Sequence, residues 1–265
     1  MLDLAQEAVG ILTTADPLEK AAAARSLGVA WRGGQVTIQG PGSPPPRPAR
    51  PLRPDLRRPG DMPKRKANGG LEKRVALLHA LAHIEFNAID LAWDLIARFG
   101  SADLPRAFFD DWVRVGDEEA QHFTMLATRL NELGASYGDL PAHDGLWQAA
   151  EETSHDLLAR LAIVPLVLEA RGLDVSPATI ADLRRSGDEA SAAALDIIYR
   201  DEIGHVAAGK RWFDHVALAR GHDPATIWQH LVAKHFRGRL KPPFNRAARD
   251  EAGFSAAFYE PIALA

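Results

Sequence analysis

The sequence predicts an all-α protein, and three observations support that fold class. Between Leu71 and Gly221, apolar residues recur at intervals of three and four, the period of an amphipathic helix. Glycine or a capping residue with proline stands at the ends of these segments, where helices stop and start. Runs of alternating β-branched residues, which strands favour, are absent from the sequence. Four segments are long enough for a four-helix bundle, with an N-terminal helical and proline-rich region before it and a C-terminal extension after it.

The first 70 residues differ in composition from the rest. Residues 1–40 form a small helical segment, in which Asp16 is the expected N-cap and Pro17 the first helical residue. Residues 41–70 are rich in proline and basic residues, with nine prolines and eight arginines or lysines between 41 and 66. Proline at this density prevents a helix or a central strand, so an extended strap or linker is expected here.

Four principal helices are predicted within one domain, residues 71–221. Their expected ranges are 71–99, 105–134, 146–171 and 187–220, each ending at a glycine. A short helix is expected after Ser176-Pro177, and another begins at Asp223-Pro224. Residues 222–265 then form a C-terminal helix and an irregular tail that begins at 237.

Composition excludes several kinds of site. The chain has no cysteine, so disulfides, zinc–thiolate sites and thiol catalysis are excluded, and any metal must be bound by nitrogen and oxygen. A net charge of -4 gives no global positive field for nucleic acid or a membrane surface. The N-terminus lacks a signal-peptide pattern and no segment approaches 18 uncharged apolar residues. We therefore expect a cytoplasmic protein with no membrane span.

One set of residue types occurs twice in the same order. The first set is Glu85, then Glu119 with His122 three residues later; the second is Glu169, then Glu202 with His205 three residues later. Every member of the second set follows its counterpart by 83 or 84 residues. Because residues three apart share a helix face, each Glu-x-x-His pair can direct a carboxylate and an imidazole at one point.

These six side chains are the predicted ligands of a two-metal centre. Carboxylates can bridge two cations and offset their charge, and imidazole suits iron and other borderline metals. Residues around Glu85 and Glu202 on the same helix face are mainly apolar, and a buried carboxylate needs a partner or a metal. The ions are expected to be iron, with manganese as the alternative.

The sequence holds a third Glu-x-x-His pair, Glu152 and His155. His155 would lie about 21 Å from Glu169 along a continuous helix, at about 1.5 Å per residue. We interpret this pair as a polar pair at the end of the bundle and not as part of the metal centre. His79 and His83 face away from Glu85 around the helix, and we expect them at the solvent or in an interface. The remaining histidines, among them His235, are expected at the surface.

At these ligand residues the chain resembles the ferritin-like di-iron superfamily. Residues 168–175 (LEARGLDV) and 241–245 (KPPFN) resemble, more narrowly, an uncharacterised bacterial family known as domain of unknown function 455. That resemblance covers about residues 1–260 and implies a ferritin-like fold. Within the superfamily, the tRNA-hydroxylating MiaE enzymes are distantly similar. Glu169 departs from the pattern, because it is expected in the last turn before Gly172 and not in mid-helix.

The resemblance also implies roles for acids beside the ligands. In many such proteins, the acid before the Glu-x-x-His glutamate hydrogen-bonds the histidine of the opposite half, which here implies Glu118 toward His205 and Asp201 toward His122. Tyr199 precedes Glu202 by three residues on the same face. It could act in catalysis, or it could be a core tyrosine whose hydroxyl is satisfied by hydrogen bonds.

Three functions fit this pattern. The first is an O₂-activating oxidase or hydroxylase acting on a small molecule, with a tRNA-modifying hydroxylase as a variant. The second is a non-catalytic protein that binds or buffers iron, and the third is a binding protein with structural metals. The Arg/Pro strap is expected to wrap on its own bundle, so we predict weak nucleic-acid binding at most. A homodimer is left open.

Overall fold

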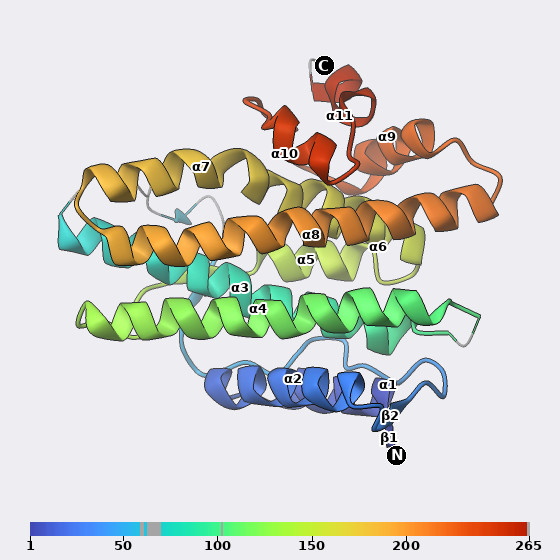
Figure 1. The fold of residues 1–265 in the computed structure, drawn as a ribbon, viewed down its shortest axis with the longest axis horizontal. Helices are drawn as coiled ribbons and strands as arrows, with labels where there is room; N and C mark the ends of the chain where they lie inside the picture. Colours follow the sequence, from blue (N-terminus) through green and yellow to red (C-terminus); the bar gives the residue numbers. More distant parts are fainter. Residues whose placement is uncertain (59–60, 63–69, 102, 264–265) are drawn as a thin grey trace. The chain divides into compact units, whose positions relative to one another are not determined.

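The computed structural model describes residues 1–58, 61–62, 70–101 and 103–263. Its regular structure is almost entirely helical, which confirms the all-α fold class (Figure 1). Within the described residues, the strands are two residues long and form parallel pairs. β1 (Leu2–Asp3) pairs with β2 (Val36–Thr37), and β3 (Leu56–Arg57) pairs with β4 (Ala142–His143). The parts of the predicted strap at 59–60 and 63–69 lie outside the described residues.

Helices occupy most of the described residues outside the long segment that contains the strap. In order they are α1 (Leu4–Thr13), α2 (Pro17–Arg32), α3 (Leu71–Phe99), α4 (Arg106–Glu132), α5 (Gly145–Glu152), α6 (Leu157–Ile163), the π-helix η2 (Val164–Glu169), α7 (Ala170–Arg185), α8 (Glu189–Ala219), α9 (Pro224–His235), α10 (Arg246–Glu251) and α11 (Ala256–Ala263).

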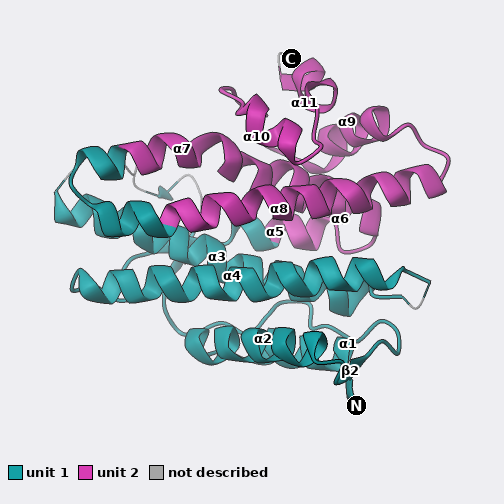
Figure 2. Cartoon of the chain, in the orientation of Figure 1, with its two compact units in different colours: residues 1–147, 182–194 teal, residues 148–181, 195–265 magenta. Residues whose placement is uncertain are grey.

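The chain divides into two compact units (Figure 2). The first comprises residues 1–147 and 182–194, and therefore contains α1 to α4. The second comprises residues 148–181 and 195–265, and contains α6, η2, α9, α10, α11 and most of α7 and α8.

In the first unit, α3 packs along α4, α2 packs on α4, and α1 packs on α3. The predicted start of α2 is confirmed, because the Asp16 carboxylate accepts hydrogen bonds from the backbone N–H groups of Leu18 and Glu19. Gly116 of α4 lies against Trp93 of α3, and a Cβ at Gly116 would stand 2.7 Å from the indole ring. A side chain at Gly116 would therefore force the two helices apart.

Helix α3 is long and apolar enough to cross a membrane by length and composition alone. However, 72% of its most apolar 18-residue window is buried inside the protein. It also contains buried acids, among them Glu85, Asp90 and Asp94. These properties are those of the central helix of a helical core, and are consistent with a soluble protein.

The described part of the strap contacts helices of its own unit. The Ala49 N–H donates to the Leu12 carbonyl at 2.8 Å, and the Gly42 N–H donates to the Ala97 carbonyl at 2.7 Å. Because these bonds are made by the backbone, they hold the strap against α1 and α3 whatever its side chains do.

The interpretation of His79 and His83 as solvent or interface residues is wrong. Both side chains are buried, with exposed fractions of 1% and 4%. Tyr137, in the segment after α4, stacks on both imidazole rings and covers them. His79 Nε2 accepts the Gly138 N–H at 2.9 Å. The angular positions of the two histidines on α3 correctly predicted that they point away from Glu85. However, that side of α3 is also buried, because Tyr137 covers it.

The environment of His83 predicts a pH dependence of stability. Burial, with the nearby Arg50 charge, lowers the pKa of His83 from 6.5 to about 3. Below pH 6.5 the unfolded chain takes up a proton that the folded chain does not, so the free energy of unfolding falls as the pH decreases toward 3. Between pH 7 and pH 5 this loss is about 2 kcal/mol.

Urea unfolding of the metal-free protein at pH 7 and pH 5 measures this effect. His83→Gln should lose about 2 kcal/mol less stability over that interval than the wild type. The matched control is His222→Gln, an exposed position, which should follow the wild type. Equal losses in His83→Gln and the wild type would contradict the prediction.

In the second unit, the predicted helix 146–171 is several elements, and the prediction of one continuous helix is wrong. The chain breaks after α5 because Asp156 caps a new helix, accepting the Leu158 N–H. The Arg160 side chain donates to the Ala150 carbonyl at 2.7 Å, which satisfies an acceptor at the end of α5. Pro165 has no N–H to donate to the preceding turn, and η2 forms around it.

The predicted stop at Gly172 is also wrong. Gly172 has no positive φ and lies within α7, so the segment continues as helix to Arg185. Pro177 lies inside α7, where it leaves the Leu173 carbonyl without its helical donor. The Asn245 side chain donates to that carbonyl at 3.0 Å, which compensates for the missing bond.

Residues 237–265 are not the irregular tail that was predicted, because they contain α10 and α11. Asn245 caps α10 by accepting the Ala248 N–H. The Arg249 guanidinium is buried and forms an ion pair with Asp174 of α7 at 2.8 Å. Buried charges of this kind need their partner, so the tail is fixed to α7 by a polar contact that hydrophobic periodicity does not reveal.

Candidate metal centre

The first half of the predicted ligand set comes together in the first unit. Glu85 lies on α3, and Glu119 and His122 lie on α4; all three are buried. His122 Nδ1 is 3.3 Å from Glu85 Oε2 and 3.5 Å from Glu119 Oε2. One potential ligand atom from each residue lies within 4.8 Å of those of the other two. This buried cluster of Glu and His residues could hold a metal ion.

The geometry follows from the way α3 and α4 pack. The two helices are joined by a short connection, so they are antiparallel neighbours. Gly116, which allows the close approach to Trp93, precedes Glu119 by three residues and shares its helix face. The contact at Gly116 therefore holds the face that bears Glu119 against α3.

The two carboxylates of this half are electrostatically unfavourable in the absence of a cation. Burial and the adjacent Glu119 charge raise the pKa of Glu85 well above its usual range, although His122 opposes the shift. Glu85 Oε2 is buried and accepts no hydrogen bond within the described residues. A cation bound here would offset both carboxylates and coordinate that oxygen, so the residues fit a metal ion.

The second unit contains the other half of the set. Glu202 and His205 lie on α8, both buried, with His205 Nδ1 3.6 Å from Glu202 Oε1. Glu169 is the last residue of η2 and is half-buried. Because η2 continues directly into α7, Glu169 is a mid-helix residue, and the prediction that it lies in the last turn of its helix is wrong.

Close packing also fixes the position of η2 against α8. A Cβ at Gly209 of α8 would stand 2.3 Å from the Pro165 Cβ of η2. Gly209 follows Glu202 by seven residues, two turns along the same helix face. Each unit thus has one glycine, Gly116 or Gly209, that brings the helix with the Glu-x-x-His pair close to the helix with the lone glutamate.

The predicted neighbours of the ligands have contacts of their own. Glu118 is half-buried and accepts a hydrogen bond from Arg114 at 3.0 Å. Asp201 is half-buried on α8. The hydroxyl of Tyr199 accepts a hydrogen bond from the Asn245 side chain at 2.8 Å, which supports a satisfied structural tyrosine.

Both members of the third Glu-x-x-His pair contact a residue of α9. Glu152 lies 3.8 Å from His235 Nδ1, and the His155 ring packs on the His235 ring. His235 is buried, so its expected surface location is wrong. The partner of Glu152 comes from α9, and spacing within one helix could not indicate it.

Comparison with known proteins identifies the family. A family model described as "Protein of unknown function (DUF455)" matches residues 13–260. The chain therefore belongs to the DUF455 family. An uncharacterised protein of Haemophilus influenzae is 44% identical over 210 residues, which are 77% of this chain and 73% of the relative. No solved structure matches the chain.

The two stretches that resembled the DUF455 family contact each other in the second unit. The Arg171 guanidinium donates to the Lys241 carbonyl at 2.6 Å, and the Asn245 N–H donates to Asp174 at 2.9 Å. These two motifs of the family therefore form one structural contact, between α7 and the chain before α10.

Proposed function

We propose that this protein is a ferritin-like four-helix bundle that binds two metal ions through both half-sites together. The observation that supports this best is that each unit holds, on its own helices, a lone glutamate and a Glu-x-x-His pair. Two cations would offset the charge of four carboxylates, three of which are buried. The proposed ligands are Glu85, Glu119, His122, Glu169, Glu202 and His205, with iron as the metal and manganese as the alternative.

The proposed activity is an O₂-dependent oxidation or hydroxylation of a small molecule. Iron ions held by carboxylates and imidazoles, with coordination positions left open, can bind and reduce O₂. The chain itself would hold the ions and exclude water from them. Glu119 and His122 have no exposed surface and Glu85 is 5% exposed, and this burial keeps the surroundings of the ligands dry.

Metal content and oxygen consumption test this proposal. Protein reconstituted anaerobically with iron(II) should contain about two ions per chain by elemental analysis. On mixing with O₂, it should consume oxygen in a fast step whose amplitude stops increasing at two irons per chain. Less than one bound ion per chain would contradict the site itself.

The same titration separates the other functions. An iron-buffering protein would continue to oxidise iron well beyond two ions per chain. A structural site would bind metal and consume no oxygen. The oxygen measurement is repeated after small-molecule extracts of cells are added to the iron-loaded protein. An oxidation that needs a bound substrate would then be detected.

A tRNA-modifying variant of the activity is disfavoured by the strap. Arg47 and Arg50, two of its basic residues, are used in ion pairs with Asp144 and Asp90 of the same unit. We therefore predict that tRNA binds weakly in gel-shift or anisotropy titrations at 150 mM salt. Tight binding that falls steeply with salt and is lost in Arg57→Gln/Arg58→Gln would contradict this and favour the tRNA-modifying function.

Glu118 and Asp201 are proposed to orient the histidines of the opposite half, which would fix the tautomers of the rings. A cytoplasmic location is also proposed, since the cysteine-free chain has its apolar helix α3 mostly buried. A homodimer is left to measurement of the mass in solution.

A further inference from the structure

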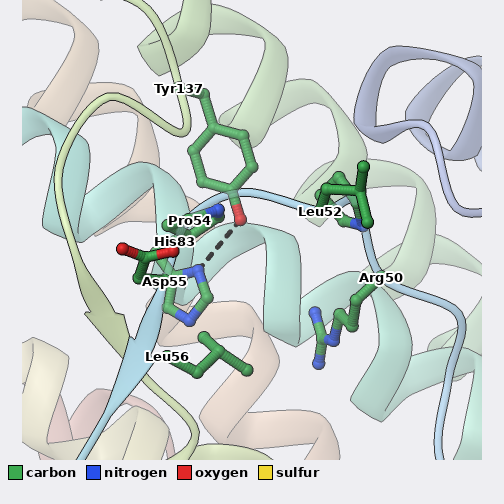
Figure 3. A pocket seen from close by; sticks show the side chains of 8 residues that line it. Arg50, Leu52, Pro54, Asp55, Leu56, His83 and Tyr137 are labelled. Carbon is green, nitrogen blue, oxygen red and sulfur yellow. Dashed lines mark hydrogen bonds between the residues drawn. The ribbon is translucent and has the colours of Figure 1, made fainter.

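A second site lies in the first unit, between the strap and α3. A cavity of about 290 Å³ opens there, near the lower end of the size range for small-molecule sites. Figure 3 shows the guanidinium of Arg50, the imidazole of His83 and the hydroxyl of Tyr137 facing this space. The apolar part of the lining comes from the strap itself, at Pro51, Leu52, Pro54 and Leu56.

The Arg50 side of the cavity has more positive than negative charge. Asp90 is fully buried, and two cations share it: Lys20 at 2.5 Å, also fully buried, and Arg50 Nη1 at 2.9 Å. The next acid on α3, Asp94, is paired with Arg98. The Arg50 charge shares its carboxylate with Lys20 and is only partly balanced by it, and an anion in the cavity would balance the rest.

Arg50 also has donors left for such an anion. Within the described residues, its guanidinium makes one hydrogen bond, from Nη2 to Asn87 Oδ1 at 2.6 Å. Nη1 is buried and faces Asp90, so the donors left for a ligand are Nε–H and the second N–H of Nη2. A guanidinium has five N–H donors in a planar fork that matches a carboxylate.

The direction of one hydrogen-bond chain defines what Tyr137 offers to a ligand. His83 Nε2 lies 3.1 Å from the His143 carbonyl oxygen, which can only accept, so Nε2 has the proton. His83 Nδ1 must then accept, and the Tyr137 hydroxyl donates to it at 2.9 Å. The Tyr137 oxygen therefore faces the cavity as an acceptor and calls for a donor on the ligand.

We propose that this cavity binds a small organic acid with three features: a carboxylate opposite Arg50, a hydroxyl or amino donor opposite Tyr137, and an apolar body against the strap. The carboxylate matches the partly balanced charge of Arg50, and the donor matches the oriented hydroxyl. The exposed Asp55 lies at the rim, across the cavity from Arg50 (Figure 3), where it would attract an amino group more than a hydroxyl. The site uses none of the proposed metal ligands, so the test of this proposal does not depend on the metal centre.

Four matched probes test the proposal by calorimetry with the full chain. They are 2-hydroxy-4-methylpentanoate, L-leucine, 4-methylpentanoate, which lacks the second donor, and 2-hydroxy-4-methylpentanamide, which lacks the carboxylate. The hydroxy acid, the amino acid or both should bind at least tenfold more tightly than the probe that lacks the donor and the probe that lacks the charge. The order of the first two distinguishes a hydroxy acid from an amino acid as the natural class.

Two variants locate the binding. Arg50→Gln should weaken the preferred acid at least tenfold and leave the amide unchanged, because only the carboxylate uses the charge. Tyr137→Phe removes one oxygen with little change in shape, and should reduce the affinity of the preferred acid to that of 4-methylpentanoate. Arg57→Gln, an exposed strap residue that does not line the cavity, is the control.

The proposal is overturned if neither acid binds at 10 mM, about the weakest affinity that calorimetry can detect. It is also overturned if Tyr137→Phe, with a wild-type melting curve, binds the preferred acid as the wild type does. The Arg50→Gln result is used only if the circular dichroism spectrum of this variant matches that of the wild type. If the spectra differ, the binding result for Tyr137→Phe alone tests the proposal.

Discussion

Replacing Glu119 by glutamine should abolish tight metal binding and at the same time make the metal-free protein more stable. Glu119 and Glu85 are both buried, and their mutual repulsion with desolvation raises the pKa of Glu85. An amide of the same shape removes one charge and can donate a hydrogen bond to the remaining carboxylate. The expected gain for the metal-free protein is about 1–2 kcal/mol at pH 7.

The size of the stability gain in Glu119→Gln depends on pH. A carboxyl whose folded pKa is raised keeps its proton where the unfolded chain loses it, so the wild type loses stability as the pH rises above 4.5, the ordinary value for Glu85. The advantage of Glu119→Gln should therefore shrink as the pH falls toward 4.5. With iron or manganese present the order reverses, because only the wild type gains the free energy of metal binding.

Elemental analysis and thermal unfolding with and without metal measure both effects. Metal content should fall from about two ions per chain to below one in Glu119→Gln, and likewise in Glu202→Ala. Glu152→Gln is the matched control, since Glu152 belongs to the third Glu-x-x-His pair and contacts His235. Full metal content in Glu119→Gln, or a metal-free variant less stable than the wild type, would refute this account of the site.

Gly209→Ala should destabilise the protein by about 3 kcal/mol, because the added Cβ would stand 2.3 Å from the Pro165 Cβ and 2.6 Å from its Cγ. A proline ring cannot rotate away, so α8 and η2 must separate. The matched control is Gly172→Ala, another glycine within a helix, where no atom lies within 4 Å of the added Cβ. There the substitution should stabilise by about 0.5–1 kcal/mol, since alanine loses less conformational entropy on folding.

Urea unfolding of the two variants gives opposite signs if this packing is correct. Because Glu169 is the last residue of η2, Gly209→Ala should also weaken metal binding, whereas Gly172→Ala should not. Equal stability of the two variants would mean that α8 and η2 do not pack closely at this point.

Local signals predicted the helices well where they act within one turn. The range 71–99 was predicted without error, and the caps at Asp16 and Asp223 are formed as expected. At both caps the stabilising partner is a backbone N–H two or three residues away, so the sequence contains both partners side by side. Within each set, the Glu-x-x-His pair could be recognised for the same reason, since its two residues lie on one helix.

Prediction failed where the deciding partner is distant in sequence. Gly172 was predicted as a helix end and Ser176-Pro177 as the start of a new helix, and both predictions are wrong because α7 continues through these residues. Asn245, about 70 residues later, satisfies the carbonyl that Pro177 leaves open. A glycine and a proline are weak stop signals when tertiary contacts compensate for them. The same holds for His235, which its contact with Glu152 removes from the surface.

The sequence by itself determined the fold class and predicted the residue types of the proposed metal centre, because both depend on helical periodicity and on ligand chemistry. Only the tertiary structure decided the electrostatic states of the buried groups. The raised pKa of Glu85, the neutral His83 and the cations that share Asp90 all result from burial and from partners on other elements. Desolvation and charge–charge distances are properties of the packed molecule, and they convert a pattern of ionisable residues into sites with a defined charge.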